Sequence, residues 1–73
     1  MFVICANGVN RRGELVGPWQ VRNGFTRKED AAKFLSGMIS VRPAKTAGYD
    51  SERDFWWMQI GDVVTRYSIA PCR

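Results

Sequence analysis

The first six residues of the chain, MFVICA, are all apolar, so both alternating sets of positions in this run are hydrophobic. A strand that is buried on both faces shows this pattern. The dipeptide Asn7-Gly8 favours a turn at the end of such a strand. We therefore predict a strand over residues 1–6, followed by an exposed basic loop over residues 9–13 that contains Arg11 and Arg12.

A second strand is predicted from Glu14 to Arg22. Gly17-Pro18 lies in the middle of this segment, and a proline cannot donate a backbone hydrogen bond to a neighbouring strand. The strand should therefore be bulged or lie at an edge of the sheet. Asn23-Gly24 is expected to end it.

The next segment has the pattern of an amphipathic helix. Thr26 and Glu29 have the spacing of a capping box, in which each side chain satisfies a backbone N–H of the other residue. Pro43 disfavours helical geometry at residue 42, so we predict a helix that begins at Thr26 and ends by Ser40 or Val41. Its apolar residues recur at a spacing that places them on one face, namely Ala31, Phe34, Leu35, Met38 and Ile39.

The C-terminal part predicts a long loop and a hairpin. Residues 42–54 are rich in turn-forming residues, and loops of this length are often functional or mobile. Strands over residues 55–60 and 63–70 follow, joined by Gly61-Asp62 in the pattern of a type II′ turn. One face of this hairpin is apolar enough to receive the helix. The predicted fold class is α+β, an antiparallel β-sheet in the order ββαββ with one helix packed on one face.

The other face of the hairpin would carry Phe55, Trp57, Val64 and Arg66, with no second helix to cover them. On one interpretation the long loop folds over this face, or Arg66 stacks on Trp57 as a cation–π pair worth roughly 0.5–1 kcal/mol. On the other, the face binds a partner, because Trp, Tyr and Arg are enriched at binding hot spots. Trp19, on the predicted edge strand, would extend such a patch.

Length and composition limit the class of protein. A chain of 73 residues forms one domain, and 45% hydrophobic with 25% charged residues is typical of a globular fold. No apolar run approaches the roughly 20 residues that span a membrane, and the N-terminal run lacks the basic stretch of a signal peptide. We expect a single-domain monomer in the cytosol.

The net charge of +4 resides in the N-terminal part of the chain. A basic surface attracts either a phosphate backbone or an acidic protein surface, and a solvated surface that keeps the protein soluble is the plainer alternative. Together with the aromatic face, it leaves single-stranded nucleic-acid binding open as a second function, although no RNP-type motif is present. Before residue 29, Glu14 is the one acidic residue among these basic ones: Arg11, Arg12, Arg22, Arg27 and Lys28.

Residues that commonly carry catalysis are scarce. The chain has no histidine, and its two cysteines, Cys5 and Cys72, do not form a Cys-x-x-Cys motif. Zinc sites and histidine-activated nucleophiles are thereby excluded. We expect two reduced thiols, with a bridge between the cysteines as the alternative. The interpretation is a binding protein with no cofactor, metal or catalytic residue. Its predicted partner-binding residues are Arg11, Arg12, Trp19, Arg22, Phe55, Trp57 and Arg66.

With its basic loop at residues 9–13, its capped helix and the aromatic run Phe55-Trp56-Trp57, the whole chain resembles the small RNA-polymerase-binding transcription regulators of lytic Xanthomonas phages. The resemblance implies a protein that binds the host polymerase near the N-terminus of the β′ subunit. It further implies that the protein inhibits promoter initiation by weakening the hold of σ, and that it allows readthrough of terminators.

Overall fold

The computed structural model describes residues 1–71, which form one helix and five strands. The strands and the helix confirm the predicted α+β class, with one strand more than the order ββαββ. In chain order the elements are β1 (Phe2–Val9), β2 (Leu15–Phe25), α1 (Lys28–Ser40), β3 (Ala47–Asp50), β4 (Phe55–Ile60) and β5 (Val63–Pro71).

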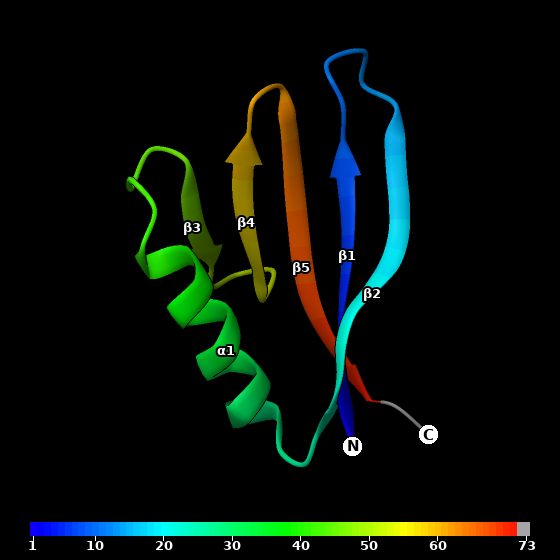
Figure 1. Ribbon diagram of the computed structural model, residues 1–73, viewed down its shortest axis with the longest axis vertical. Coiled ribbons are helices and arrows are strands. Elements are labelled where there is room, and N and C mark those ends of the chain that lie inside the picture. The colour runs from blue at the N-terminus through cyan, green and yellow to red at the C-terminus, as the bar shows by residue number, and fades with distance from the viewer. Residues whose placement is uncertain (72–73) are drawn as a thin grey trace.

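The five strands within residues 1–71 form one antiparallel sheet in the order β2-β1-β5-β4-β3 (Figure 1). Strand β1, which lies between β2 and β5, is buried on both faces as predicted, because Val3 and Ile4 point to opposite sides and expose 7% and 0% of their surface. It does not end at Asn7-Gly8 but continues to Val9. The turn comes later, where the side-chain carbonyl of Asn10 accepts hydrogen bonds from two backbone N–H groups of the loop.

Strand β2 is both an edge strand and a bulged one, as Gly17-Pro18 predicted. Its pairing with β1 shifts register at three places, and Gly17 adopts a positive φ of 98°. The predicted end at Asn23-Gly24 is wrong, because β2 extends to Phe25, which pairs with Phe2.

The predicted start of helix α1 is wrong by one residue. Arg27, not Thr26, is the N-cap: its backbone is extended, and no side chain caps the first turn. Instead the Arg27 guanidinium lies 3.4 Å from the Asp30 carboxylate. The rest of the prediction is confirmed, since α1 ends at Ser40 and buries Ala31 and Leu35 completely, with the other apolar residues packed around them.

The predicted hairpin and its register are confirmed. Ile60 pairs with Val63 and Trp57 with Arg66 across a turn in which Gly61 has a φ of 60°. On the face that was expected to receive the helix, Trp56 and Met58 are buried, whereas Ile60 at the turn is exposed.

The predicted loop over residues 42–54 is wrong in its middle, where β3 pairs with β4 and becomes the second edge of the sheet. The strand is only four residues long, with two half-buried positions, and so has too little alternation to be recognised in a sequence. Because β3 widens the sheet, it does not fold over the outer face as one interpretation required.

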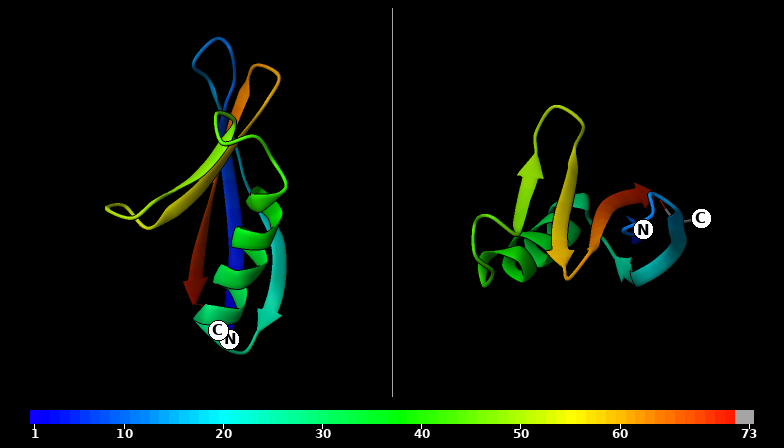
Figure 2. Two further views of the ribbon diagram at one scale, coloured as in Figure 1. Left: turned by 90° about the vertical axis from the view of Figure 1, so that its left-hand side faces the viewer. Right: turned by 90° about the horizontal axis from the view of Figure 1, so that it is seen from above.

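The helix covers one face of the sheet, which we call the inner face (Figures 1 and 2). A row of cross-strand partners runs over all five strands on this face, from Trp19 through Ala6, Tyr67 and Trp56 to Tyr49. The middle of the row is buried under α1, and both ends are open to solvent. Within residues 1–71 no helix covers the opposite, outer face, although Val3 of β1 is buried on it. The part of the chain that the structure describes contains no helix that is long and apolar enough to cross a membrane.

Candidate functional site

The residues predicted to bind a partner separate into three places on the molecule. Phe55, Trp57 and Arg66 lie together on the outer face, on strands β4 and β5, and we call this group the outer patch. Arg66 is exposed, and the two aromatic residues are half-buried. The outer patch is therefore an accessible surface with aromatic rings held beside a guanidinium.

Contacts within the outer patch differ from the predicted stacking of Arg66 on Trp57. The Arg66 guanidinium lies over the ring of Phe55, with its central carbon 5.1 Å from the ring centroid. The indole of Trp57 instead lies close to Gly48, where an added Cβ would be only 2.9 Å from the indole nitrogen. Each aromatic ring thus has its own contact, Phe55 with Arg66 and Trp57 with Gly48.

Trp19 and Arg22 do not extend the outer patch. They pair with Ala6 and Ile4, whose side chains belong to the core beneath the helix, so both lie on the inner face. Trp19 is 41% exposed at the end of the inner row. The Arg22 guanidinium is engaged within the chain, because it lies 5.0 Å from the ring centroid of Phe34 and 5.6 Å from that of Phe25.

Arg11 and Arg12 lie in the exposed loop that joins β1 and β2, away from both faces. Arg11 is 3.6 Å from Asp62 in the turn between β4 and β5. Glu14 is also in this loop, so two basic and two acidic residues lie at this end of the sheet. The basic residues of the N-terminal part therefore do not gather into one patch.

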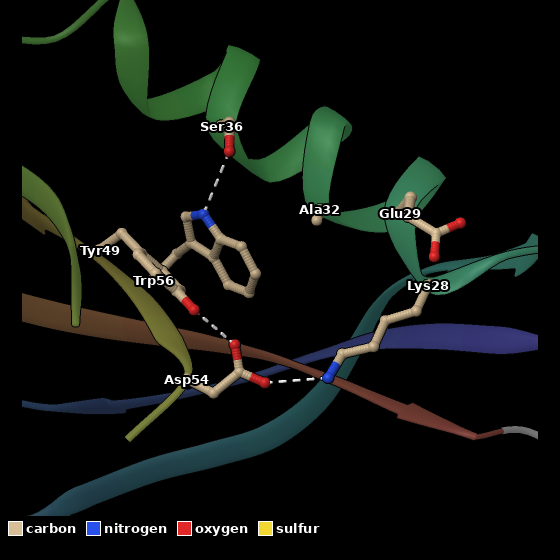
Figure 3. Close-up of a pocket in the computed structure, with 7 residues that line it drawn as sticks. All are labelled: Lys28, Glu29, Ala32, Ser36, Tyr49, Asp54 and Trp56. Carbon is tan, nitrogen blue, oxygen red and sulfur yellow. Dashed lines mark hydrogen bonds and ion pairs between the residues drawn. The ribbon is translucent and has the colours of Figure 1, made fainter. Parts of the chain in front are cut away.

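A cleft of about 400 Å³ lies on the inner side, between the N-terminal half of α1 and the edge formed by β3 and β4. The rings of Tyr49 and Trp56 form its floor, with centroids 4.6 Å apart and planes inclined at 41°. Figure 3 shows Ser36 and Asp54 on opposite sides of these rings, and Lys28 and Glu29 farther along, near the start of α1. The complete lining is Lys28, Glu29, Ala32, Ser36, Tyr49, Asp54 and Trp56.

Asp54 organises the rim of this cleft. It has a left-handed φ of 56°, a conformation that Asp tolerates better than most residues. The Tyr49 hydroxyl donates to its Oδ1 at 2.7 Å, and Lys28 Nζ donates to its Oδ2 at 2.9 Å (Figure 3). Across the cleft, Trp56 Nε1 donates to Ser36 Oγ at 3.4 Å and links the floor to the helix.

These hydrogen bonds shift two pKa values in opposite directions. The Tyr49 hydroxyl and then Lys28 lower the pKa of Asp54, because both stabilise its ionised carboxylate. The same hydrogen bond to Asp54 raises the pKa of Tyr49, because it favours the protonated phenol. At neutral pH the rim therefore presents an ionised Asp54 and a neutral Tyr49.

The cleft was not predicted from the sequence. Trp56 was assigned correctly to the inner face, but Tyr49 and Asp54 fell in the segment interpreted as a loop. The one sequence feature that indicates a strand here is Tyr49, between Gly48 and Asp50. One aromatic residue is too short a pattern to distinguish a strand from a loop.

No group of three or more His, Cys, Asp or Glu side chains within residues 1–71 is placed to hold a metal ion. Cys5 is half-buried, and Cys72, the other half of the alternative disulfide, lies outside the described residues. Comparison of the chain with protein-family models, with curated protein sequences and with solved structures found no match.

Proposed function

We propose that the chain is a protein-binding module, not an enzyme, that docks on bacterial RNA polymerase through the outer patch. As the sequence resemblance implies, it would bind near the N-terminus of the β′ subunit in the host cytosol. It would inhibit initiation by weakening σ binding, and it would act as an antiterminator. The observation that carries the proposal is the outer patch itself, which combines two aromatic rings and a guanidinium on a face that no helix within residues 1–71 covers.

The outer patch is suited to docking because its groups are already held in place. Trp57 rests on Gly48 and Arg66 on Phe55, so little side-chain freedom remains to be lost when a partner binds. Aromatic and arginine side chains of this kind commonly dominate the binding energy of an interface.

A single-stranded nucleic acid is the second candidate, because bases could stack on Trp57 beside Arg66. Of the four arginines predicted for the interface, however, Arg66 alone lies on the outer face. Nucleic-acid affinity depends mainly on the number of phosphates that basic residues neutralise. The scattered arginines therefore favour a protein partner.

Gel filtration with purified core polymerase in the absence of DNA tests the proposal, after nuclease treatment of both proteins. We expect co-elution at micromolar concentration, and inhibition of initiation at σ-dependent promoters in a purified transcription assay. If the chain elutes alone but is retained by single-stranded DNA or RNA, the nucleic-acid function replaces the polymerase proposal.

Variants separate the outer patch from the other predicted residues. Trp57→Ala and Arg66→Glu should each weaken binding by about 2 kcal/mol, which is roughly a 30-fold loss of affinity. Trp19→Ala is the matched control, because it removes an exposed tryptophan from the opposite face. Loss of binding in the control alone would place the interface at strand β2. Circular dichroism should show that each variant is folded.

A further inference from the structure

The cleft beside helix α1 takes no part in the proposed docking through the outer patch, because it opens on the opposite side of β4. Its volume of about 400 Å³ falls within the range of sites that hold small ligands or single side chains. Its floor is aromatic and its rim is charged, so apolar contact and charge recognition are both available to an occupant (Figure 3).

The lining of the cleft is acidic in balance although the chain as a whole is basic. One positive side chain, Lys28, accompanies two negative ones, Glu29 and Asp54, whereas the chain carries a net charge of +4. Lys28 is already paired with Asp54 at 2.9 Å. Arg27 Nε lies 3.9 Å from Glu29, but the same guanidinium lies closer to Asp30.

The aromatic floor adds to this preference for positive charge. The faces of Tyr49 and Trp56 carry the negative part of the ring quadrupole, which attracts cations. The two carboxylates keep lone pairs that their present partners do not fill, because each ionised carboxylate can accept about four hydrogen bonds. An anion would meet both carboxylates and only Lys28 to attract it.

We propose that this cleft binds a positively charged side chain, arginine or lysine, of a partner protein. The aliphatic part of that side chain would lie on Trp56 and Ala32, and its charged head would meet the Asp54 carboxylate, while Glu29 adds negative charge at the other end of the cleft (Figure 3). The hydroxyl of Tyr49 holds the Asp54 carboxylate in position. Lys28 lies in an exposed pair, which costs little to open. The inference rests on the cleft and does not depend on which protein the outer patch binds.

A titration with isolated residues tests the site without any partner protein. N-acetyl-arginine N-methylamide is the probe, its citrulline analogue is the neutral control of the same shape, and the glutamate analogue is the anion. The readout is the indole N–H signal of Trp56 in a ¹H–¹⁵N correlation spectrum, because this group faces the cleft and donates to Ser36. We expect the arginine compound to shift this signal with an affinity near about 1 mM, and the other two to leave it unchanged.

Two single substitutions distinguish a cation site from an anion site. Glu29→Gln should weaken arginine binding about two- to fivefold, whereas Glu52→Gln removes the same charge outside the cleft and should have no effect. Lys28→Gln should strengthen arginine binding by a similar factor, because it removes a competing cation. If the cleft is an anion site, Lys28 is the group that recognises the anion, and Lys28→Gln should weaken binding of the glutamate analogue.

The proposal is wrong if the glutamate analogue binds in place of the arginine compound, or if neither shifts the Trp56 signal up to about 10 mM. It is also wrong if Lys28→Gln weakens binding of the arginine compound. Because polymerase is absent from this titration, failure of the cleft leaves the docking proposal standing. Conversely, failure of the chain to bind polymerase would leave the proposal for the cleft standing.

Discussion

The glycine at position 48 shapes the outer patch because it has no side chain. Gly48 lies opposite Trp57 in the pairing of β3 with β4. A Cβ at this position would stand 2.9 to 3.1 Å from three atoms of the indole, closer than ordinary van der Waals contact. The φ of Gly48 is not in the left-handed region, so its backbone conformation does not require glycine. The close approach of the indole does.

Gly48→Ala should therefore destabilise the protein by about 1–3 kcal/mol, the usual cost of overpacking, as the indole is lifted from the strand. Gly37→Ala is the matched control. An added Cβ at Gly37 in the exposed part of α1 meets nothing within 4 Å, so this variant should be more stable by about 0.5–1 kcal/mol. Urea denaturation measures both changes, and equal effects of the two substitutions would contradict the packing of Trp57 on Gly48.

Asp54 should give the protein an acid-sensitive contribution to its stability. Its pKa is lowered in the folded state, so the stabilisation is present above the ordinary carboxyl value of 3.8 and is lost as the pH falls through the lowered value. Asp54→Asn should accordingly be less stable than the wild type at neutral pH, with the difference shrinking under acid conditions. Denaturation curves across this range measure the difference.

The alkaline titration of Tyr49 provides an independent check on the same contact. Its pKa should fall toward the ordinary value of 10.0 in Asp54→Asn, because the hydrogen bond to the carboxylate is its largest cause of elevation. The absorbance of ionised tyrosine reports this change, while the raised pKa of Tyr67, which burial causes, serves as an internal reference. An unaltered titration of both tyrosines would show that Tyr49 and Asp54 do not interact in solution.

At the scale of elements, the start of helix α1 shows a feature that could be improved. Arg27 has the extended backbone of an N-cap but a side chain that cannot accept a hydrogen bond from the first turn. Arg27→Ser should therefore stabilise the protein by about 0.5–1 kcal/mol, despite the loss of exposed ion pairs that contribute little. Thr26→Ala, one residue earlier, should change the denaturation midpoint very little. If Thr26→Ala is clearly destabilising and Arg27→Ser brings no gain in stability, Thr26 is the N-cap after all.

Elements with a strong local signal could be predicted from the sequence, and those that depend on distant residues could not. The helix stripe and the β4–β5 register follow from spacing and from Gly61-Asp62, so both were predicted correctly. Strand β3 was missed because its four residues become a strand only by pairing with β4. The cleft was missed with it, since Tyr49 reaches Trp56 only across that pairing. For the same reason, the side of the sheet on which Trp19 lies depends on the bulges of β2.

At the scale of the whole molecule, one face of the sheet packs the core under helix α1, and the other carries the outer patch. Burial of Ile4, Ala31 and Leu35 holds the sheet and helix together, whereas the outer patch contributes to no core that the structure describes. Arg11 and Arg12 lie away from both faces, in the loop at the end of the sheet. Substitutions at Arg11 and Arg12 should therefore change the long-range attraction to a partner, and substitutions in the outer patch should change the direct contacts with it.

Charge reversal tests this separation in the complex proposed with polymerase. Arg11→Glu together with Arg12→Glu lowers the net charge by four, from +4 to zero, at positions outside the outer patch. If the partner surface is acidic, the double variant should associate more slowly and depend less on salt, while its dissociation rate stays close to that of the wild type. Arg66→Glu should instead raise the dissociation rate, because it removes a contact within the interface. Biosensor kinetics at two salt concentrations measure both rates. A faster dissociation of the double variant would place the β1–β2 loop inside the interface.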